Sequence, residues 1–279
     1  MNTVIIGECG INHNSDINIA KQLIDVCSEL NLPYVKFQKR DIESTYTKEF
    51  LDSPRESPWG NTQRAQKEAL ELSLEQYKEI DEYCNKKGNI GWFASPWDLK
   101  SITFLKENFP NMPYLKIPSA KVTDEEYLKK CVESGFDLIM STGMSDLSMV
   151  QKAVLIVKDK LKYLLHCCST YPNKTEELNL SQIRLLSYYF KNLNCKIGFS
   201  NHHQSVLFMA EAVIFGAEMI ETHITLGRHL YGSDQSVSIE PQGLRKLIKY
   251  IKETEKAIGT LDKKILDSEI PIMNKLRNL

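Results

Sequence analysis

The run Val4-Ile-Ile-Gly-Glu-Cys-Gly10 (VIIGECG) is the first of eight short β-rich segments that recur along the chain. The others are YVKFQK (34–39), IGWFASP (90–96), YLKIPS (114–119), DLIMST (137–142), KYLLHCC (162–168), KIGFSN (196–201) and MIETHIT (219–225). Amphipathic stretches separate these segments, with apolar residues at the three- and four-residue spacing of a helix. Eight strand–helix repeats predict a parallel sheet closed into a single (β/α)8 TIM barrel.

An open, doubly wound sheet is the alternative architecture, and a glycine-rich turn after the first strand would favour it. That turn is GECGINHNSD (7–16), which lacks the GxGxxG pattern, so we do not expect a dinucleotide site. Four aspartates are predicted helix N-caps: Asp16, Asp98, Asp124 and Asp146. Residues 41–72 are predicted to form a long loop. We predict one domain, with the barrel at 1–260 and a C-terminal tail at 261–279.

The composition argues against several classes of partner. The net charge is −1 and acidic and basic residues are interspersed, so we do not expect a basic surface patch that binds nucleic acid. No segment reaches the ~18 uninterrupted apolar residues of a membrane span, and the N-terminus lacks the basic region of a signal peptide. Seven cysteines, an odd number, indicate reduced thiols. We therefore expect a cytoplasmic protein without membrane contact.

Polar side chains stand at the end of every predicted strand, where barrels of this class carry their active sites. In chain order they are Glu8, Asn12 and His13; Lys36 and Gln38; Ser95; Lys116 and Ser119; Ser141 and Thr142; His166, Ser169 and Tyr171; Ser200 and His202; Glu221 and His223. Strand residues two apart share a face, so such pairs converge on one mouth. Lysines beside hydroxyls predict a phosphate or carboxylate site, although any single serine is equally explained as a core hydroxyl.

Two histidines are the candidate metal ligands. His202 and His223 end neighbouring strands, so both imidazoles can reach one divalent cation, although a third ligand is not defined. His203 is predicted to point the other way. Glu8 and Glu221 need a partner to stay buried, and either a metal or simple pairing with the two lysines would supply it.

These residues together carry a family resemblance. The motifs GECGINHN, VKFQK, FASPWD, LKIPSA, STGMS, HCCSTYP, GFSNHH and ETHITLGRHLYGSDQSVSIEP resemble, in order, those of the N-acetylneuraminate (sialic acid) synthase family. The resemblance implies a (β/α)8 transferase that condenses phosphoenolpyruvate with an aldose such as N-acetylmannosamine. The products are phosphate and a sialic-acid-like 3-deoxy-2-ulosonic acid.

The resemblance also implies roles for individual residues. Glu8, Gln38, Glu221 and Asp234 match catalytic positions, and His202 and His223 match the ligands of Mn2+, Mg2+ or Co2+. The substrate-binding positions are Lys36, Ser95, Lys116, Ser119, Ser141, Ser169, Tyr171 and Ser200.

Several departures concern the sugar half of the site. Ala120 and Lys121 follow Ser119 where the family has glycine and glutamate; Ser169 replaces a common asparagine, Asn201 an aspartate, and Gly227 another aspartate. The sequence ends at SEIPIMNKLRNL, which suggests a short form without the family's C-terminal antifreeze-like domain. That domain lends an arginine to the partner's sugar site, so a homodimer is one option rather than a requirement. Candidates to close the mouth are Arg55, Trp59 and Arg64, or the segment with Arg228, Tyr231 and Asp234.

Three alternatives remain open on sequence alone. The same chemistry could act on a shorter, non-acylated aldose and give a Kdo-like product. The barrel could instead be a Schiff-base aldolase with Lys116 or Lys36 as nucleophile, or a sugar-binding barrel without activity. Borohydride trapping distinguishes the imine route, because condensation of phosphoenolpyruvate forms no imine.

Overall fold

Eight parallel strands close into a barrel in the computed structural model, which describes residues 3–277. They are β1 (Val4–Gly10), β2 (Tyr34–Lys39), β5 (Gly91–Pro96), β6 (Tyr114–Ile117), β7 (Asp137–Ser141), β8 (Leu161–Cys167), β9 (Lys196–Asn201) and β10 (Met219–His223). Each strand pairs with its neighbours along the chain, and β1 closes the ring by pairing with both β10 and β2. The predicted barrel is confirmed, and the strand bounds differ from the predicted ones by at most two residues.

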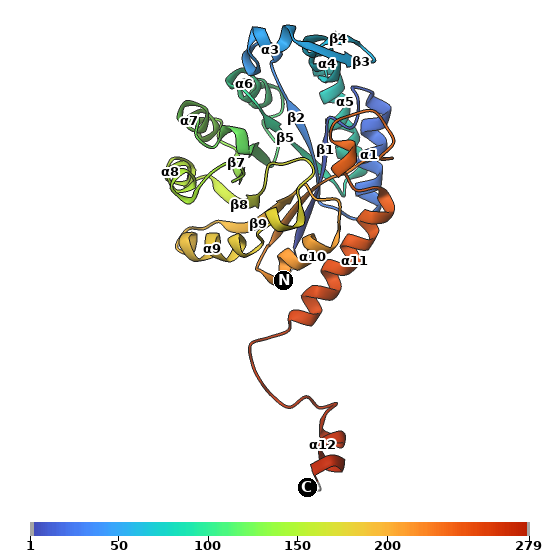
Figure 1. The fold of residues 1–279 in the computed structure, drawn as a ribbon, viewed down its shortest axis with the longest axis vertical. Coiled ribbons are helices and arrows are strands. Elements are labelled where there is room, and N and C mark those ends of the chain that lie inside the picture. Colours follow the sequence, from blue (N-terminus) through green and yellow to red (C-terminus); the bar gives the residue numbers. More distant parts are fainter. Residues whose placement is uncertain (1–2, 278–279) are drawn as a thin grey trace.

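Helices surround the barrel as an outer layer (Figure 1). They are α1 (Ile17–Glu29), α5 (Leu74–Lys87), α6 (Leu99–Asn108), α7 (Glu125–Glu133), α8 (Leu147–Val157), α9 (Ser181–Phe190), α10 (Leu207–Ile214) and α11 (Pro241–Ile258). The four predicted aspartate N-caps are confirmed, since each side chain accepts a hydrogen bond from a first-turn backbone N–H. The apolar stripe of each helix packs on the outer face of the strands.

The segment after β2 is folded rather than a loop, which corrects the prediction for residues 41–72. It forms α2 (Ile42–Thr45), α3 (Lys48–Asp52), the hairpin of β3 (Pro54–Ser57) and β4 (Gly60–Thr62), and α4 (Gln63–Leu70). Side-chain oxygens of Asp41, Thr47 and Thr62 cap the three helices. Each oxygen accepts a hydrogen bond from a first-turn backbone N–H that would otherwise be bonded to water. We call residues 41–72 the insert.

The barrel interior changes character along its axis. Near the N-terminal ends of the strands, Tyr34, Phe93 and Tyr114 pack edge to face with ring centroids 5.5–6.0 Å apart. Two residues further along the same strands the inward positions are Lys36, Ser95 and Lys116, all buried. The polar part of the barrel interior therefore lies next to a layer of packed aromatic rings.

The chain continues beyond the barrel after α11. A final helix, α12 (Ile270–Arg277), has no buried residue and lies away from the barrel in Figure 1. The division of the chain at residue 260 stays a prediction. No helix within residues 3–277 combines the length and the hydropathy needed to cross a membrane.

Candidate active site

The main candidate site is a cavity of about 310 Å³ at the C-terminal ends of the barrel strands. The residues to which the family resemblance gives a role all line it, with the exception of Asp234: Glu8, Lys36, Gln38, Ser95, Lys116, Ser119, Ser141, Ser169, Tyr171, Ser200, His202, Glu221 and His223. They come from strands far apart in the sequence, and barrel closure brings them together. Trp97, Pro118, Ala120, Met144 and Cys167 complete the wall.

Two lysines and two carboxylates form a buried network inside this cavity. Lys36 Nζ lies 2.8 Å from Glu8 Oε2 and 3.8 Å from Glu221 Oε2, and Lys116 Nζ lies 3.5 Å from Glu221 Oε1. Gln38 Nε2 donates to Glu8 Oε1 at 2.7 Å, which fixes the orientation of that carboxylate. The four charges cancel, and this pairing offsets much of the cost of removing them from water.

Burial and pairing act differently on the two lysines. Burial opposes the charge of Lys36, but Glu221 and Glu8 outweigh it and raise the pKa of this lysine. For Lys116, burial dominates and lowers its pKa despite the neighbouring Glu221. Burial also opposes the charge of Glu221, yet the two ammonium groups hold the pKa of its carboxyl well below the usual value. The network therefore keeps the Glu221 carboxylate ionised, and of the two lysines Lys116 loses its proton more readily than Lys36.

Hydroxyl groups surround the lysines on one side of the cavity. Ser141 Oγ accepts from Lys116 Nζ at 2.7 Å, and Ser200 Oγ donates to Glu221 Oε1 at 3.0 Å. Ser119 Oγ accepts from the Gly143 N–H at 3.0 Å. A Cβ at Gly143 would lie 2.1 Å from Ser169 Oγ, so only glycine allows this close approach. The result is a cluster of rotatable donors beside two cations, which suits an oxyanion.

His202 and His223 face each other, with ring centroids 5.4 Å apart. His202 Nδ1 lies 2.8 Å from the Cys168 carbonyl, which can only accept, so this nitrogen carries a proton. In the neutral ring Nε2 is then an acceptor, and it lies 2.9 Å from the Tyr171 hydroxyl. His223 Nδ1 is buried without a hydrogen-bond partner, and its nearest anion is Asp234 Oδ2 at 3.6 Å.

This arrangement can accommodate a divalent cation, although residues 3–277 contain no ready-made cluster of three protein ligands. A buried imidazole nitrogen without a partner, a second imidazole and a nearby carboxylate are suitable donors. Water or a substrate oxygen would have to complete the coordination.

Asp234 lies just outside the cavity, at the start of the 3₁₀ helix η3 (Gln235–Val237). Gly10, with φ of +52°, makes room for it, because a Cβ there would lie 3.2 Å from Asp234 Oδ2. The same Cβ would lie 3.3 Å from His223 Nδ1 and 3.4 Å from Gln38 Nε2. A glycine at the end of β1 thus permits three functional groups to converge.

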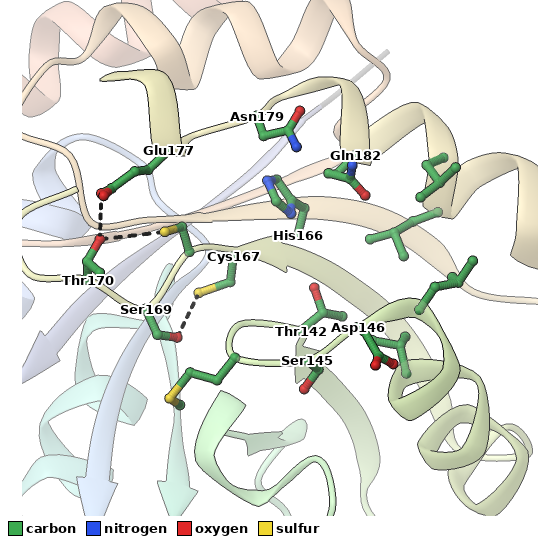
Figure 2. A pocket seen from close by; sticks show the side chains of 16 residues that line it. Thr142, Ser145, Asp146, His166, Cys167, Ser169, Thr170, Glu177, Asn179 and Gln182 are labelled. Atoms are coloured by element: carbon green, nitrogen blue, oxygen red, sulfur yellow. Dashed lines mark hydrogen bonds between the residues drawn. The ribbon is translucent and has the colours of Figure 1, made fainter. Parts of the chain in front are cut away.

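A second cavity of about 460 Å³ adjoins the first, between the ends of β7 and β8 and helices α8 and α9 (Figure 2). Cys167 and Ser169 line both cavities, and their Sγ and Oγ atoms are 3.9 Å apart. His166 belongs to the second cavity alone: its Nε2 lies 2.8 Å from the Leu178 carbonyl, and its ring stacks on Phe199. The prediction that His166 joins the main site is therefore wrong.

Cys167 is the inward residue that sequence reasoning missed. It is in phase with Tyr163 and Leu165 of β8, so alternation places these three side chains on one face of the strand without showing which face points inward. Burial opposes ionisation of the thiol, but the neighbouring His202, with Sγ 3.8 Å from Nδ1, lowers the pKa of Cys167 to about 7.

Comparison with known proteins identifies the family to which the chain belongs. Residues 23–263 match the NeuB family. The chain belongs to the NeuB family. It is 35% identical to N,N'-diacetyllegionaminic acid synthase of Campylobacter jejuni, covering 99% of this chain and 83% of that protein. It is also 35% identical to N-acetylneuraminate-9-phosphate synthase of Mus musculus, covering 98% and 76%.

Among solved structures, N-acetylneuraminic acid (sialic acid) synthetase from Leptospira borgpetersenii, in complex with citrate, superposes with a TM-score of 0.85 at 31% identity. The match covers 100% of this chain and 94% of the other. The predicted family and the predicted synthase class are confirmed for this NeuB protein. The roles of individual site residues stay predictions.

The two segments predicted to close the mouth of this NeuB barrel touch each other. Trp59 of the insert packs edge to face on Tyr231, with centroids 5.4 Å apart, and Gln66 Nε2 donates to the Tyr231 hydroxyl at 2.7 Å. Arg64 does not take part, since it pairs with Glu43 and Asp52 on the outside of the insert.

Proposed function

We propose that this NeuB protein condenses phosphoenolpyruvate with an aldose and forms a sialic-acid-like 3-deoxy-2-ulosonic acid and phosphate. The observation that supports it is the buried pair Lys36 and Lys116, at the bottom of a cavity with five serines. Such a charge arrangement suits a small, multiply charged anion. Three relatives that are named as synthases of N,N'-diacetyllegionaminic acid, N-acetylneuraminate 9-phosphate and pseudaminic acid agree with it.

In this proposal the lysines and serines hold the phosphate and carboxylate of phosphoenolpyruvate. C3 of the enol phosphate forms a bond to the aldehyde carbon, and the aldehyde oxygen takes up a proton. Water then adds at C2, loses a proton, and phosphate leaves. Lys36, Lys116 and the hydroxyls stabilise the charge that develops on the departing phosphate.

Glu8 is the proposed general base, the group that accepts a proton from water. Gln38 Nε2 donates to its Oε1 and Lys36 Nζ contacts its Oε2, so the carboxylate is held in place at the cavity wall, where it can accept a proton from the attacking water. Glu221 balances the charges of both lysines, and Asp234 places a second carboxylate 3.6 Å from His223 Nδ1.

His202 and His223 are the proposed ligands of a divalent cation, Mn2+, Mg2+ or Co2+. A cation held there would polarise the aldehyde oxygen. The Cys168 carbonyl fixes the tautomer of His202. On binding, the Tyr171 hydroxyl would have to release His202 Nε2, which it contacts in this structure.

The test measures consumption of phosphoenolpyruvate across a panel of aldoses, with chelator and after addition of each metal. We expect chelation to abolish turnover, and His202→Ala or His223→Ala to lose bound metal in elemental analysis. His203→Ala is the matched control, because this ring packs on Phe208 and accepts from Ser205 N outside the cavity. Full activity of chelated His223→Ala would contradict the metal assignment.

A Schiff-base aldolase is the second candidate, because burial lowers the pKa of Lys116 as an imine-forming lysine requires. Borohydride with pyruvate would then give a stable adduct at Lys116, visible by mass spectrometry. We expect no adduct.

A further inference from the structure

Arg40 directly follows β2 and is not one of the residues that line the main cavity. Its side chain is only 10% exposed, so a permanent positive charge is largely withdrawn from water. Such a charge is costly unless the donors of the guanidinium meet acceptors, and the groups that supply those acceptors therefore indicate what the residue does. In this structure the neighbours of the Arg40 guanidinium are Gln38, Trp97 and Glu71.

The side-chain amide of Gln38 links Arg40 to the reaction end of the cavity. Arg40 Nη2 donates to Gln38 Oε1, and Gln38 Nε2 donates to Glu8 Oε1 at 2.7 Å. Among residues 3–277, no other group donates to Gln38 Oε1. A guanidinium can only donate and a carboxylate oxygen accepts, so these two contacts define which end of the amide faces which neighbour.

Loss of Arg40 would leave this amide with a single anchor. With its Oε1 unpaired, the Gln38 side chain gains conformations in which Nε2 no longer reaches Glu8. Glu8 Oε1 would then lose its donor, while Glu8 Oε2 would keep Lys36 Nζ at 2.8 Å. The carboxylate would be held at one oxygen instead of two, and its position relative to a reacting water would vary more widely.

Arg40 is itself held by groups from two different parts of the chain. Its guanidinium stacks on Trp97, which directly follows β5, with Cζ 4.6 Å from the ring centroid. Its Nη1 lies 3.5 Å from Oε1 of Glu71, and its backbone N–H donates to Oε2 of the same carboxylate at 3.0 Å. Glu71 belongs to the insert. A side chain that is fixed by stacking and by an ion pair is well suited to orient a neighbouring side chain.

We propose that Arg40 is a positioning residue for the general base: it holds the Gln38 amide with Nε2 toward Glu8, and Gln38 in turn holds Glu8. The path from Glu71 through Arg40 and Gln38 thus ties the insert to the group that accepts a proton from water. An arginine suits this place better than a lysine, because its planar fork reaches an amide and a carboxylate while its face stacks on a ring. The inference rests on the proposed function, in which Glu8 is the general base.

The first measurement is the steady-state kinetics of Arg40→Ala and Arg40→Lys. We expect kcat per folded molecule of Arg40→Ala to fall roughly ten- to a hundred-fold, as displacement of a reacting group predicts. KM for phosphoenolpyruvate should change by less than about two-fold, because the lysines and serines proposed to hold this substrate stay in place. Arg40→Lys, which keeps a cation, should recover part of kcat and replaces Arg40→Ala in every comparison if the latter does not fold. Arg64→Ala removes an arginine that pairs on the outside of the insert, so it is the matched control and should keep kcat.

Two further readouts separate positioning from a purely structural role. Guanidinium chloride, far below denaturing concentrations, should restore part of kcat in Arg40→Ala, because the free ion can occupy the place beside Trp97 and donate to Gln38. The same salt should not help Gln38→Met. In the double variant, Arg40→Ala should reduce kcat by no more than about two-fold beyond the loss caused by Gln38→Met alone, since Arg40 acts through Gln38.

Each contrary outcome separates this inference from the proposed function. An unchanged kcat in Arg40→Ala would overturn the inference and leave the condensation intact. A loss confined to KM for the aldose would make Arg40 a binding residue and overturn it as well. Losses that multiply in the double variant would show that Arg40 does not act through Gln38. If the wild-type protein consumes no phosphoenolpyruvate with any aldose, the proposed function fails, and the inference fails with it.

Discussion

The two ends of the barrel interior have the same backbone and opposite chemistry. At the N-terminal end, Tyr34, Phe93 and Tyr114 form an aromatic triad. Two residues further along the same strands, toward their C-terminal ends, the inward side chains are Lys36, Ser95 and Lys116.

This difference shows how a barrel can hold costly charges. Aromatic packing contributes stabilisation by removing apolar area from water and by dispersion contacts. A buried ion-pair network contributes little net stability, because desolvation nearly cancels the attraction. The aromatic end therefore stabilises the fold, and the charged end is free to serve chemistry.

The largest effect that we expect from the comparison is on stability, at the aromatic end. Phe93→Ala should lower the free energy of unfolding by about 3–5 kcal/mol, because the ring is fully buried and its loss leaves a cavity. Urea denaturation would measure it. The activity of the remaining folded protein should be nearly unchanged, and a collapse of kcat/KM per folded molecule would contradict the separation of the two ends.

Lys116→Met tests the charged end with a side chain of similar length. We expect kcat/KM for phosphoenolpyruvate to fall roughly ten- to a hundred-fold with every aldose, since a charge-assisted contact is lost. Stability should fall less than in Phe93→Ala, because Glu221 keeps Lys36 and Ser200 as partners. Steady-state kinetics would check this. A loss that depends on which sugar is offered would move Lys116 to the sugar site.

Gly143→Ala tests the close approach of two serines at the charged end. The new Cβ would collide with Ser169 Oγ and Ser119 Oγ, so we expect a rise of about ten-fold in KM for phosphoenolpyruvate as both hydroxyls move. Ser169→Ala separates the loss of one hydroxyl from this displacement and should be milder. An unchanged KM in Gly143→Ala would show that the serines do not contact this substrate.

The smallest effect concerns pH, through His13 at the loop after β1. Burial, aided by the charge of Arg40, lowers the pKa of His13 to about 4, so the folded state holds it neutral. The unfolded state takes up a proton near pH 6.5, so stability should fall as pH drops from there to about 4, by at most ~1.4 kcal/mol per pH unit. His13→Asn keeps an acceptor for Ser15 N and should flatten the slope of unfolding free energy against pH. An unaltered slope would assign the acid sensitivity elsewhere.

The sequence by itself determined the barrel, the strand positions and nearly all of the cavity. Hydrophobic alternation is a local property of the chain, so the pairs Lys36 with Gln38 and Glu221 with His223 could be assigned to one face. The motif resemblance then supplied the family, which the comparisons confirm.

Only the tertiary structure decided which residues meet across elements. Alternation defines two faces of β8 but not which one faces inward, so His166 and Cys167 could be assigned only once the strand was placed in the barrel. The edge-to-face contact between Trp59 and Tyr231, and the hydrogen bond from Gln66 Nε2 to the Tyr231 hydroxyl, join the insert to the segment after β10. Such contacts depend on barrel closure and on the fold of the insert, which residue spacing along the chain does not encode.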